Sequence, residues 1–268
     1  MKKSVQTTNS NLPSTKLAVS SLMVNDISQG STGFENMGAD DLAIPFISIL
    51  QALSPQVRGV TRIKGAEEGD FFNTVTNEVI KGDIKIIPCT YQKCWVEWVS
   101  RVNGGGFVRQ HSTPDILEKT TKNDRNNDVL ANGNHIVTTA YHYCMLVKDD
   151  SSTERVVLSF TSTQLKKSRR WNSQMMSQQI VVGNRKATPP MYGYIYTVKS
   201  VEESNDQGTW AGWEITSPTL ITDTDLYLSA KKFHDDVTKG AVRTAPPSDV
   251  VDNSPLSTSV NEGESEHF

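Results

Sequence analysis

The sequence predicts a mainly β protein with a few helices, arranged as an OB-like β-barrel. Segments rich in β-branched and aromatic residues recur through the middle of the chain, whereas only two segments have the apolar spacing of a helix. A long polar insertion separates the earlier strands from the later ones. A parallel α/β sheet would require strands and helices to alternate, so this pattern favours a barrel.

Both ends of the chain are predicted to be disordered tails. Residues 1–33 are rich in Ser, Thr, Asn and Gln, and residues 241–268 contain three prolines and five serines without a sustained apolar pattern. Residues 34–240 remain, which is enough for one substantial hydrophobic core. We therefore expect a single folded domain at 34–240 between an N-terminal disordered segment and a disordered C-terminal tail.

The first elements of this domain lie before the polar insertion. An apolar run at 42–50 opens the core, and Pro45 argues against an uninterrupted helix through it. Residues 84–99 contain β-branched and aromatic residues typical of a strand, with Pro88 marking an edge or a bend. Residues 104–134 begin with three glycines and show no periodicity, so we expect a flexible insertion there.

The later elements are four strands and two helices. Asn205-Asp206-Gln207-Gly208 is a good hairpin turn between the last two strands. A helix at about 162–180 has Leu165, Asn172, Met176 and Ile180 on one side and basic residues largely on another. A second helix, capped by Thr222 or Asp223, ends at Lys239-Gly240 and is expected to pack on the core. The four strands are expected at 136–147, 155–160, 192–201 and 209–215.

Charge is distributed unevenly along the chain. The formal net charge is only −3, yet the 47 residues between Glu154 and Glu202 contain no Asp or Glu. Residues 241–268 reverse this pattern, with one arginine against five acidic residues. The chain therefore combines a basic segment with an acidic tail. The eight positive charges of the basic segment are Arg155, Lys166, Lys167, Arg169, Arg170, Arg185, Lys186 and Lys199.

Basic residues interleaved with aromatic rings indicate binding of single-stranded nucleic acid, which exposes both phosphates and base faces. Tyr192, Tyr194 and Tyr196 alternate with period two, which predicts three rings on one half-exposed face of a strand. The alternatives are a solvated charged face and aromatic residues that pack in the core. The candidate DNA-binding residues are Lys166, Lys167, Arg169, Arg170, Trp171, Arg185, Lys186, Tyr192, Tyr194 and Tyr196.

Metal binding and catalysis have weaker support in the sequence. Zinc accepts side chains such as Cys89, Cys94, His142 and Cys144. The odd spacing of Cys89 and Cys94 predicts that they face opposite sides of a strand, so we expect buried free thiols and leave zinc open. Phosphate-loop, nucleophile-elbow, zinc-protease and dinucleotide motifs are all missing from the sequence. We therefore expect a protein without cofactor or enzymatic activity.

The N-terminus and the hydropathy pattern predict a cytoplasmic protein that does not bind membranes. Residues 4–15 are polar where a secretion signal would need an apolar core. No apolar run approaches the roughly 18 residues that span a bilayer. Three cysteines cannot all pair with one another, which argues against a secreted disulfide-bonded domain.

The last twelve residues, Ser-Thr-Ser-Val-Asn-Glu-Gly-Glu-Ser-Glu-His-Phe, resemble the acidic tails of single-stranded DNA-binding proteins of bacteria and lytic phages. Residues 39–55 and 165–172 also resemble phage proteins described as single-stranded DNA-binding. The resemblance implies sequence-independent coating of single-stranded DNA in phage replication and recombination. It further implies a tail that recruits a polymerase, helicase or primase and can occupy the basic groove when DNA is absent. The tail residues concerned are Glu262, Glu264, Glu266 and Phe268.

Two other functions fit the same sequence. One is a recombination protein that anneals complementary strands, and the other is a virion or scaffolding component with a basic patch facing the packaged genome. An annealing assay separates the first from simple coating. Assembly into shells or rings, without preference for single strands, would favour the second. The sequence does not distinguish a monomer from a homo-oligomer, or a preference for DNA from one for RNA.

Overall fold

The computed structural model describes residues 42–206, 208–216 and 218–244, together with residues 23, 33, 35 and 36. The chain separates into two compact units, Met1–Asp41 and Leu42–Phe268, and the fold below is that of the second unit. The predicted disorder of residues 1–33 and 241–268 falls almost entirely outside the described residues.

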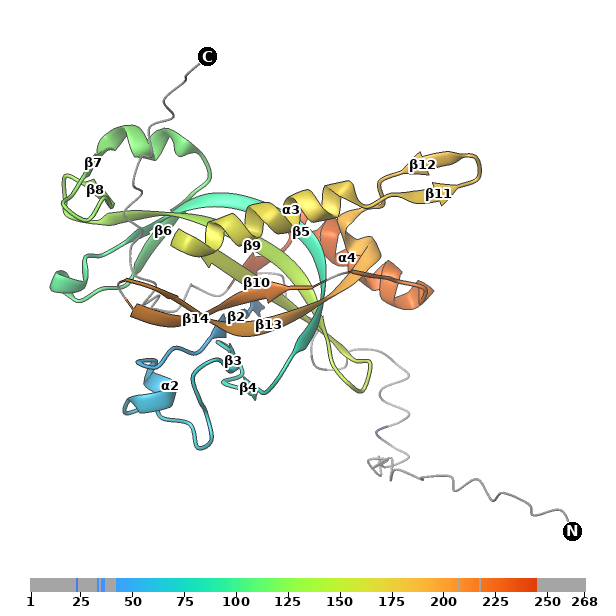
Figure 1. Cartoon of the computed structure of the whole chain (residues 1–268), viewed down its shortest axis with the longest axis horizontal. Coiled ribbons are helices and arrows are strands. Elements are labelled where there is room, and N and C mark those ends of the chain that lie inside the picture. Colours follow the sequence, from blue (N-terminus) through green and yellow to red (C-terminus); the bar gives the residue numbers. More distant parts are fainter. Residues whose placement is uncertain are drawn as a thin grey trace, which may run out of the picture. The chain divides into compact units, whose positions relative to one another are not determined.

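The described part of this unit is mainly β with few helices, as the sequence predicts. Eight strands form a sheet that curls into a half-barrel, in the order β14-β13-β5-β9-β10-β2-β3-β4 (Figure 1). Neighbours are antiparallel except β10 and β2, which run parallel. The strands are β2 (Phe46–Ile49), β3 (Phe71–Asn73), β4 (Val79–Ile80), β5 (Ile84–Trp98), β9 (His135–Val147), β10 (Thr153–Thr161), β13 (Tyr194–Asn205) and β14 (Gly208–Ile215).

The residues predicted as a flexible insertion contain regular structure. β6 (Phe107–His111) pairs with β5, and β8 (Asp128–Leu130) pairs with both β7 (Thr120–Lys122) and β9. The short helices η2 (Arg101–Asn103) and η3 (Pro114–Lys119) connect them. Strands of three to five residues are too short to give a visible period, which is why the sequence did not reveal them.

Three helices and three further strand pairings complete the described fold. The helices are α2 (Pro55–Arg58), α3 (Leu165–Ser177) and α4 (Thr224–Thr238), with short turns at η4 (Ser162–Gln164) and η5 (Met191–Gly193). β15 (Thr219–Leu220) pairs with β13, and β11 (Ile180–Val182) pairs with β12 (Arg185–Ala187). β1 (Ala43–Ile44) runs parallel to β16 (Arg243–Thr244). None of the helices in the described ranges has the length and apolar character needed to span a bilayer.

Two apolar clusters cover the two faces of the curled sheet. On the inner face, Trp171 and Met175 of α3 pack with residues such as Phe160 and Leu158 of β10. On the outer face, Ala230 and Phe233 of α4 pack with residues that include Tyr141, Tyr143 and Met145 of β9. The predicted packing role of α4 and its Asp223 cap are confirmed, since the Asp223 carboxylate accepts a hydrogen bond from Leu226 N at 3.0 Å. The predicted hairpin between β13 and β14 is confirmed as well.

The predicted packed face of the basic helix is right at its ends, where Leu165 and Ile180 pack against the inner cluster, but wrong in its middle. α3 buries Ser168, Trp171 and Met175, whereas Met176, which the sequence assigns to the packed side, is 73% exposed. The interior of the half-barrel accommodates the large Trp171 ring, and this rotates the buried stripe by one residue from the predicted one.

A bulge in β5 changes the side on which its residues lie. The register between β5 and β9 shifts between Pro88 and Thr90, so one extra residue is inserted into β5. Cys89 and Cys94 consequently both belong to the outer cluster, although an odd spacing predicts opposite faces. That prediction is wrong because strict alternation holds only in an unbroken strand.

The side chain of Gln51 connects the end of β2 to β14. Its Nε2 donates to Ala211 O at 2.9 Å, and its Oε1 accepts from Ala211 N at 3.0 Å. Gln51 follows β2, whereas Ala211 lies in β14 at one end of the sheet, and these two strands are not neighbours in the sheet order. One amide side chain therefore substitutes for a pair of strand hydrogen bonds between them.

Candidate nucleic-acid interface

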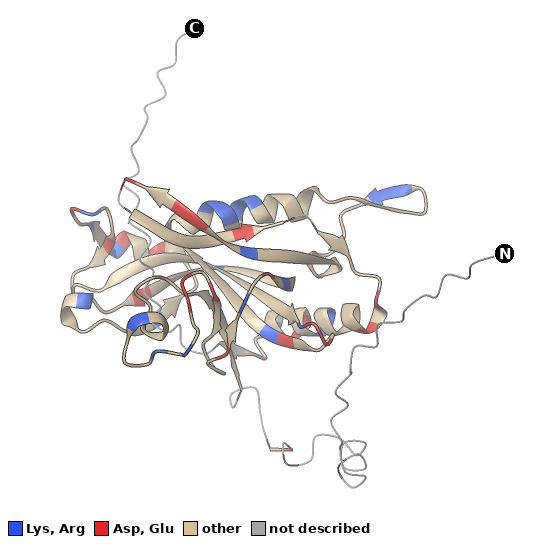
Figure 2. Ribbon diagram, turned by 60° about the horizontal axis from the view of Figure 1, so that its bottom comes forward, with Lys and Arg blue, Asp and Glu red and all other residues tan. Residues whose placement is uncertain are grey.

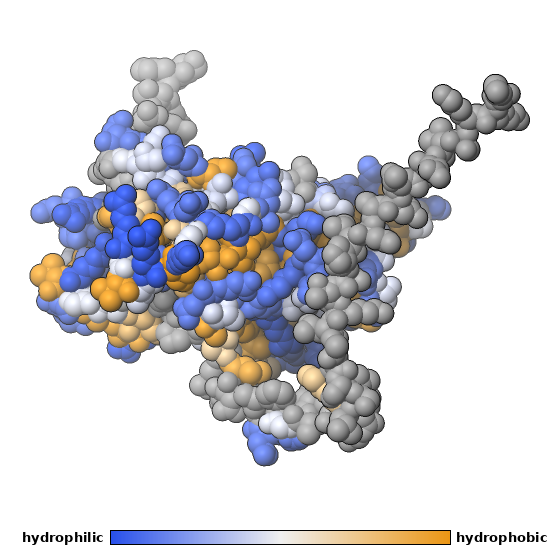
Figure 3. All heavy atoms as spheres, turned by 90° about the horizontal axis from the view of Figure 1, so that it is seen from below, coloured by the Kyte–Doolittle hydropathy of each residue, from blue (hydrophilic) through white to orange (hydrophobic). Residues whose placement is uncertain are grey.

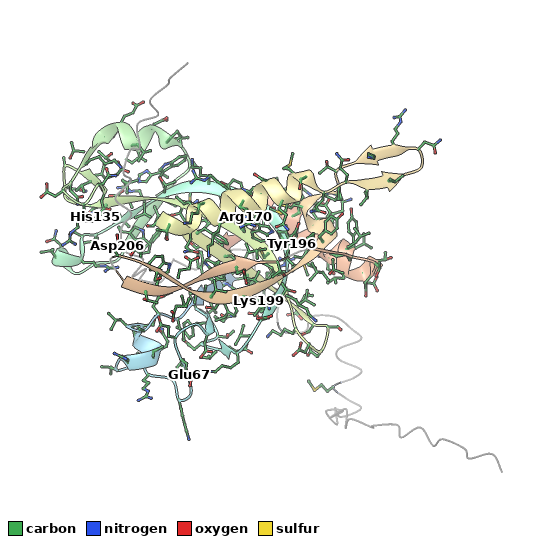
Figure 4. All side chains as sticks on the ribbon, in the orientation of Figure 1. Glu67, His135, Arg170, Tyr196, Lys199 and Asp206 are labelled. Atoms are coloured by element: carbon green, nitrogen blue, oxygen red, sulfur yellow. The ribbon has the colours of Figure 1, made fainter. Side chains whose placement is uncertain are left out.

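The exposed face of α3 carries most of the predicted basic site. Ser168, Trp171 and Met175 turn inward, so Lys166, Arg169 and Arg170, on the opposite side of the helix, are exposed. Figure 2 shows basic residues in blue along α3, and Figure 4 labels Arg170 on this helix. Three of the predicted cations therefore share one side of a single helix.

Three of the eight cations in the acid-free segment are neutralised by acids that lie elsewhere in the chain. Arg155 pairs with Asp236 at 3.0 Å, and its guanidinium lies 5.0 Å from the centre of the Phe233 ring. Lys199 pairs with Asp83 at 2.9 Å. Lys167 pairs with Glu203 and also donates to Trp213 O.

Lys167 is therefore part of a half-buried network of hydrogen bonds, which contradicts its predicted role as a free DNA contact. Glu203 also accepts hydrogen bonds from Gln164 at 2.8 Å and from Trp210 Nε1 at 3.0 Å. Burial alone would raise the pKa of Glu203, but the hydrogen bonds from Lys167 and Gln164 outweigh it and lower the pKa. Glu203 thus stays ionised at neutral pH and holds the charge of Lys167.

The other five cations form no ion pair with any carboxylate in the described part of the chain. All five lie on α3 or on the hairpin that directly follows it in the chain. We call this set the α3–hairpin surface. It consists of Lys166, Arg169, Arg170, Arg185 and Lys186.

The β11–β12 hairpin extends beyond the end of α3 (Figure 1). Within the described residues its two strands pair only with each other. Gly183, the first residue of the turn, has a φ of +60°, which a glycine adopts without strain. Val181 and Val182 are 71% and 61% exposed and lie opposite Lys186 and Arg185. The hairpin is therefore an exposed arm on which each valine faces a cation.

Most of the predicted aromatic contacts lie in the core. Trp171, Tyr194 and Tyr196 belong to the inner cluster and are 1%, 9% and 0% exposed. Figure 4 labels Tyr196 on β13, and its ring lies 5.5 Å from that of Trp171 on α3. The prediction of stacking by these rings is wrong, because packing inside the half-barrel leaves no face open. The sequence argument assumed that a buried hydroxyl needs a partner, yet no described residue hydrogen-bonds to the Tyr196 hydroxyl.

Tyr192 lies on the opposite side of the sheet from the other two tyrosines. It belongs to η5 rather than to β13, and its ring packs 5.5 Å from Tyr227 and 5.3 Å from His234 on α4. The predicted row of three rings is therefore wrong, because the short helical turn breaks the alternation before the strand begins. Tyr192 is not brought together with the α3–hairpin surface.

The sequence argument did not consider Tyr91 of β5, which is an exposed aromatic residue. Tyr91 is 37% exposed, and Arg169 lies close enough for its charge to act on the Tyr91 phenol. The sequence could have indicated this exposure, because Tyr91 is followed by the polar residues Gln92 and Lys93 in a strand otherwise rich in apolar residues. The bulge that turns it toward α3 has no such signal.

The four candidate zinc ligands are divided between the two clusters. Cys144 packs in the inner cluster beside His142, whereas Cys89 and Cys94 belong to the outer cluster. Burial raises the pKa of Cys89 and Cys94 to about 12 and raises that of Cys144 as well. Among the described residues, no group of three or more His, Cys, Asp or Glu side chains is placed to hold a metal ion.

Other parts of the described surface differ in charge from the α3–hairpin surface. A depression of about 600 Å³ beside α2 is lined by Arg58 and Arg62 together with Glu67 and Glu68. Figure 3 shows the face seen from below, on which apolar patches are bordered by hydrophilic residues. Mixed charge of this kind gives little net attraction for phosphates. The tail residues Glu262, Glu264, Glu266 and Phe268 lie outside the described residues.

Comparison with known proteins adds one finding. A family model described as "Pam3 phage gp34-like protein" matches residues 13–243. No curated protein and no solved structure matches the chain.

Proposed function

The chain belongs to the Pam3 phage gp34-like family, and we propose that this phage protein coats single-stranded DNA without sequence preference during phage replication and recombination. The observation that carries the proposal is the α3–hairpin surface, where five cations without an ion-pair partner among the described residues lie on α3 and on the hairpin that follows it. Such cations can neutralise phosphates and release their counterions.

We also propose that the half-barrel is OB-like, with the long segment between β5 and β9 as its loop insertion. β13, β5, β9 and β10 lie in the order of a Greek key, and β14 follows as a fifth strand beside β13. α3 lies in the chain between β10 and β13. β2 and the Gln51 side chain fill the gap between β10 and β14. This order supports an OB-like fold of five strands, extended by β2, β3 and β4.

The α3 side is a better place for DNA than the outer face of the sheet. OB folds bind oligonucleotides on the face of their second and third strands, which correspond here to β9 and β10. Their outer residues Tyr141, Tyr143 and Val157 are buried beneath a cluster that includes Phe233 of α4. The exposed cations lie instead on α3 and the hairpin.

The test is equilibrium binding of fluorescent oligothymidine to the full chain over a range of salt concentrations. If Z phosphates are neutralised, log K should fall with log salt by about 0.7Z for a single strand. Replacing Arg169 and Arg170 by alanine should reduce that slope by about 1.4 and weaken binding on the order of tenfold at 0.1 M salt. Equal binding at low and high salt would contradict the proposal.

A matched control is available on the other face of the sheet. Lys231 and Lys232 are adjacent, exposed and free of ion pairs with described carboxylates, but they lie on α4. The K231A/K232A variant removes the same charge as R169A/R170A from a different place. We expect it to keep the slope of the unmodified chain. An equal loss in both variants would indicate general attraction rather than a defined surface.

The hairpin gives some support to an assembly role as well. Val181 and Val182 are exposed on strands that have no further partner in the described residues, and such edges favour pairing with another chain. A virion or scaffolding component would form shells or rings and bind duplex as well as single strands. Light scattering combined with duplex binding separates this alternative. An annealing assay tests whether the protein also pairs complementary strands.

We further propose that the acidic tail recruits a replication protein such as a polymerase, helicase or primase. The support is the resemblance of its sequence, in which acids close on the terminal Phe268. Acidic residues match basic partner surfaces, and a terminal ring with its carboxylate can fill a small pocket.

A further inference from the structure

Tyr91 lies where the sheet meets the α3–hairpin surface. The bulge between Pro88 and Thr90 places it opposite His142 of β9, whose side chain points toward α3. Without the extra residue, Tyr91 would share the outer side of β5 with Cys89 and would be separated from α3 by the sheet. The bulge therefore brings one aromatic ring of β5 to the basic helix.

The Tyr91 ring is held by a series of packed rings that leads into the core. It meets His142 edge-on, with 5.2 Å between ring centres and an interplanar angle of 62°. His142 in turn stacks on Trp171 at 4.4 Å and meets Phe160 edge-on at 5.2 Å. His142, Phe160 and Trp171 are at most 1% exposed. The exposed ring thus sits on a rigid base, and ordering it costs little when a ligand binds.

The surroundings of Tyr91 suit a nucleotide. Its hydroxyl makes no hydrogen bond within the described residues. Burial raises the pKa of the Tyr91 phenol, whereas the nearby positive charge of Arg169 acts to lower it. Lys93 follows two residues later on the same side of β5, is exposed, and lies 5.5 Å from the centre of the Trp95 ring. A partly exposed ring therefore lies beside cations from two different elements.

We infer that Tyr91 is the base-stacking residue of the single-stranded DNA site, with Arg169 and Lys93 neutralising the phosphates on either side of the stacked base. The inference rests on the proposed function and extends the site from α3 onto β5. Base stacking on an aromatic ring tolerates any sequence, because every base has a π face. Paired and stacked bases of a duplex are not available to such a ring, so Tyr91 gives a preference for single strands.

The experiment compares the full chain with its Y91A, Y91F and Y91L variants in binding to oligothymidine and to a duplex of equal length. Y91A and Y91L should weaken single-strand binding by roughly 5- to 150-fold, the range expected for losing one stacked base. Their salt slope should not change, because no charge is removed. Y91F keeps the ring and should bind as the unmodified chain does, and duplex binding should be the same for all.

The matched control is Y227A, which removes a half-buried tyrosine from α4 on the opposite side of the sheet. A loss in Y227A as large as that in Y91A would overturn the inference. If the small side chain of Y91A disturbs the packed rings beneath it, the melting temperature of that variant will fall. The stacking role is then judged from Y91L, which keeps an apolar side chain at this position. A direct readout is photocrosslinking of the unmodified chain to oligonucleotides that carry 5-iododeoxyuridine, with mass spectrometry to locate the bond.

The outcomes separate the inference from the proposed function. If the unmodified chain binds single strands and the crosslink forms at Tyr91, both stand. If the unmodified chain binds single strands with the expected salt slope, but Y91A and Y91L bind them as tightly as it does, Tyr91 is not a stacking residue. The phosphate site on α3 then remains. If the unmodified chain does not bind single-stranded DNA at any salt concentration, both are overturned.

Discussion

His142 is a fully buried titratable side chain on the inner face of the sheet. It is 0% exposed, stacks on Trp171, and its Nε2 lies 2.8 Å from Ser168 Oγ, so it connects β9 to α3. Burial lowers the pKa of His142 to about 3. The imidazole is therefore neutral in the folded chain at any pH at which the protein is expected to work.

Stability should therefore fall in mild acid because of His142. In the unfolded chain its pKa returns to about 6.5, so between that value and about 3 the unfolded state binds more protons. The neutral His142 contributes its full share of stability above pH 6.5. This contribution is lost progressively as the pH falls from about 6.5 to about 3. We expect the free energy of unfolding to drop by up to about 1.4 kcal/mol per pH unit, as measured by urea titration.

Variants at two histidines isolate this effect. H142N removes the titrating group and should flatten the dependence of the free energy of unfolding on pH between pH 6.5 and 5. H135N, at a half-buried histidine of β9, should retain this dependence. Glu97 and Glu203 do not affect this comparison, because their pKa values in the folded chain are lowered from 4.5. Their contribution to stability is therefore lost only below the pH range tested here. Parallel curves for H142N and the unmodified chain would show that His142 is not the cause.

At the residue scale, the sequence identified the basic cluster but not which of its members are free. The acids that neutralise Arg155, Lys167 and Lys199 lie far away in the chain, so no local count of charge reveals them. Aromatic residues posed a similar difficulty. Trp171 beside two arginines and Tyr91 beside Lys93 look alike in sequence, yet only Tyr91 reaches the surface.

Among the elements, the connection from Gln51 to β14 offers the clearest test of the half-barrel. Gln51 makes two hydrogen bonds to Ala211, which is 8% exposed. Q51A leaves a backbone donor and an acceptor without partners, and we expect a loss of about 1–3 kcal/mol in the free energy of unfolding. Chemical denaturation of both proteins measures it.

A nearby glutamine provides the comparison for Q51A. Gln56 of α2 is half-buried, and its side chain makes no hydrogen bond within the described residues. Q56A should therefore cost little. A similar loss of stability in Q56A and Q51A would mean that the effect comes from packing near α2, and not from the bonds to β14.

The sequence predicted those elements whose signal is local and missed those that depend on an irregularity. Strands β9, β10, β13 and β14 and the cap of α4 follow from period, turn residues and Asp223. The bulge near Cys89 and the η5 turn before Tyr194 each interrupt the alternation of side chains between the two faces of a strand. Neither irregularity is visible in the apolar periodicity of the sequence. The connection between β2 and β14 likewise depends on Gln51, whose hydrogen-bond partner lies 160 residues away.

For the whole molecule, the predicted competition between tail and DNA requires a carefully placed truncation. Arg243 and Thr244 form β16, which pairs with β1, so a truncation at Gly240 would remove part of the folded unit. A chain ending after Thr244 should bind oligothymidine more tightly than the full chain at low salt, because the competing acids are gone. The difference should shrink as salt rises.

Charge and length can be separated in the same assay. A full-length chain with Glu262, Glu264 and Glu266 replaced by glutamine keeps the tail but removes three of its charges. It should approach the affinity of the truncated chain. Binding by the truncated chain that equals or falls below that of the full chain would count against an autoinhibitory tail.

The parallel pairing of β1 with β16 has one more consequence. Ala43 lies beside Arg243 and Ile44 beside Thr244, so the first and last strands of the described domain are neighbours. Adjacent strands are about 4.8 Å apart, and a linker of a few residues from Thr244 back to Leu42 would close the polypeptide into a ring. New termini could then be opened in the exposed turn at Gly183-Asn184. Such a circular permutant should fold to the same half-barrel, with its N- and C-termini at the tip of the arm.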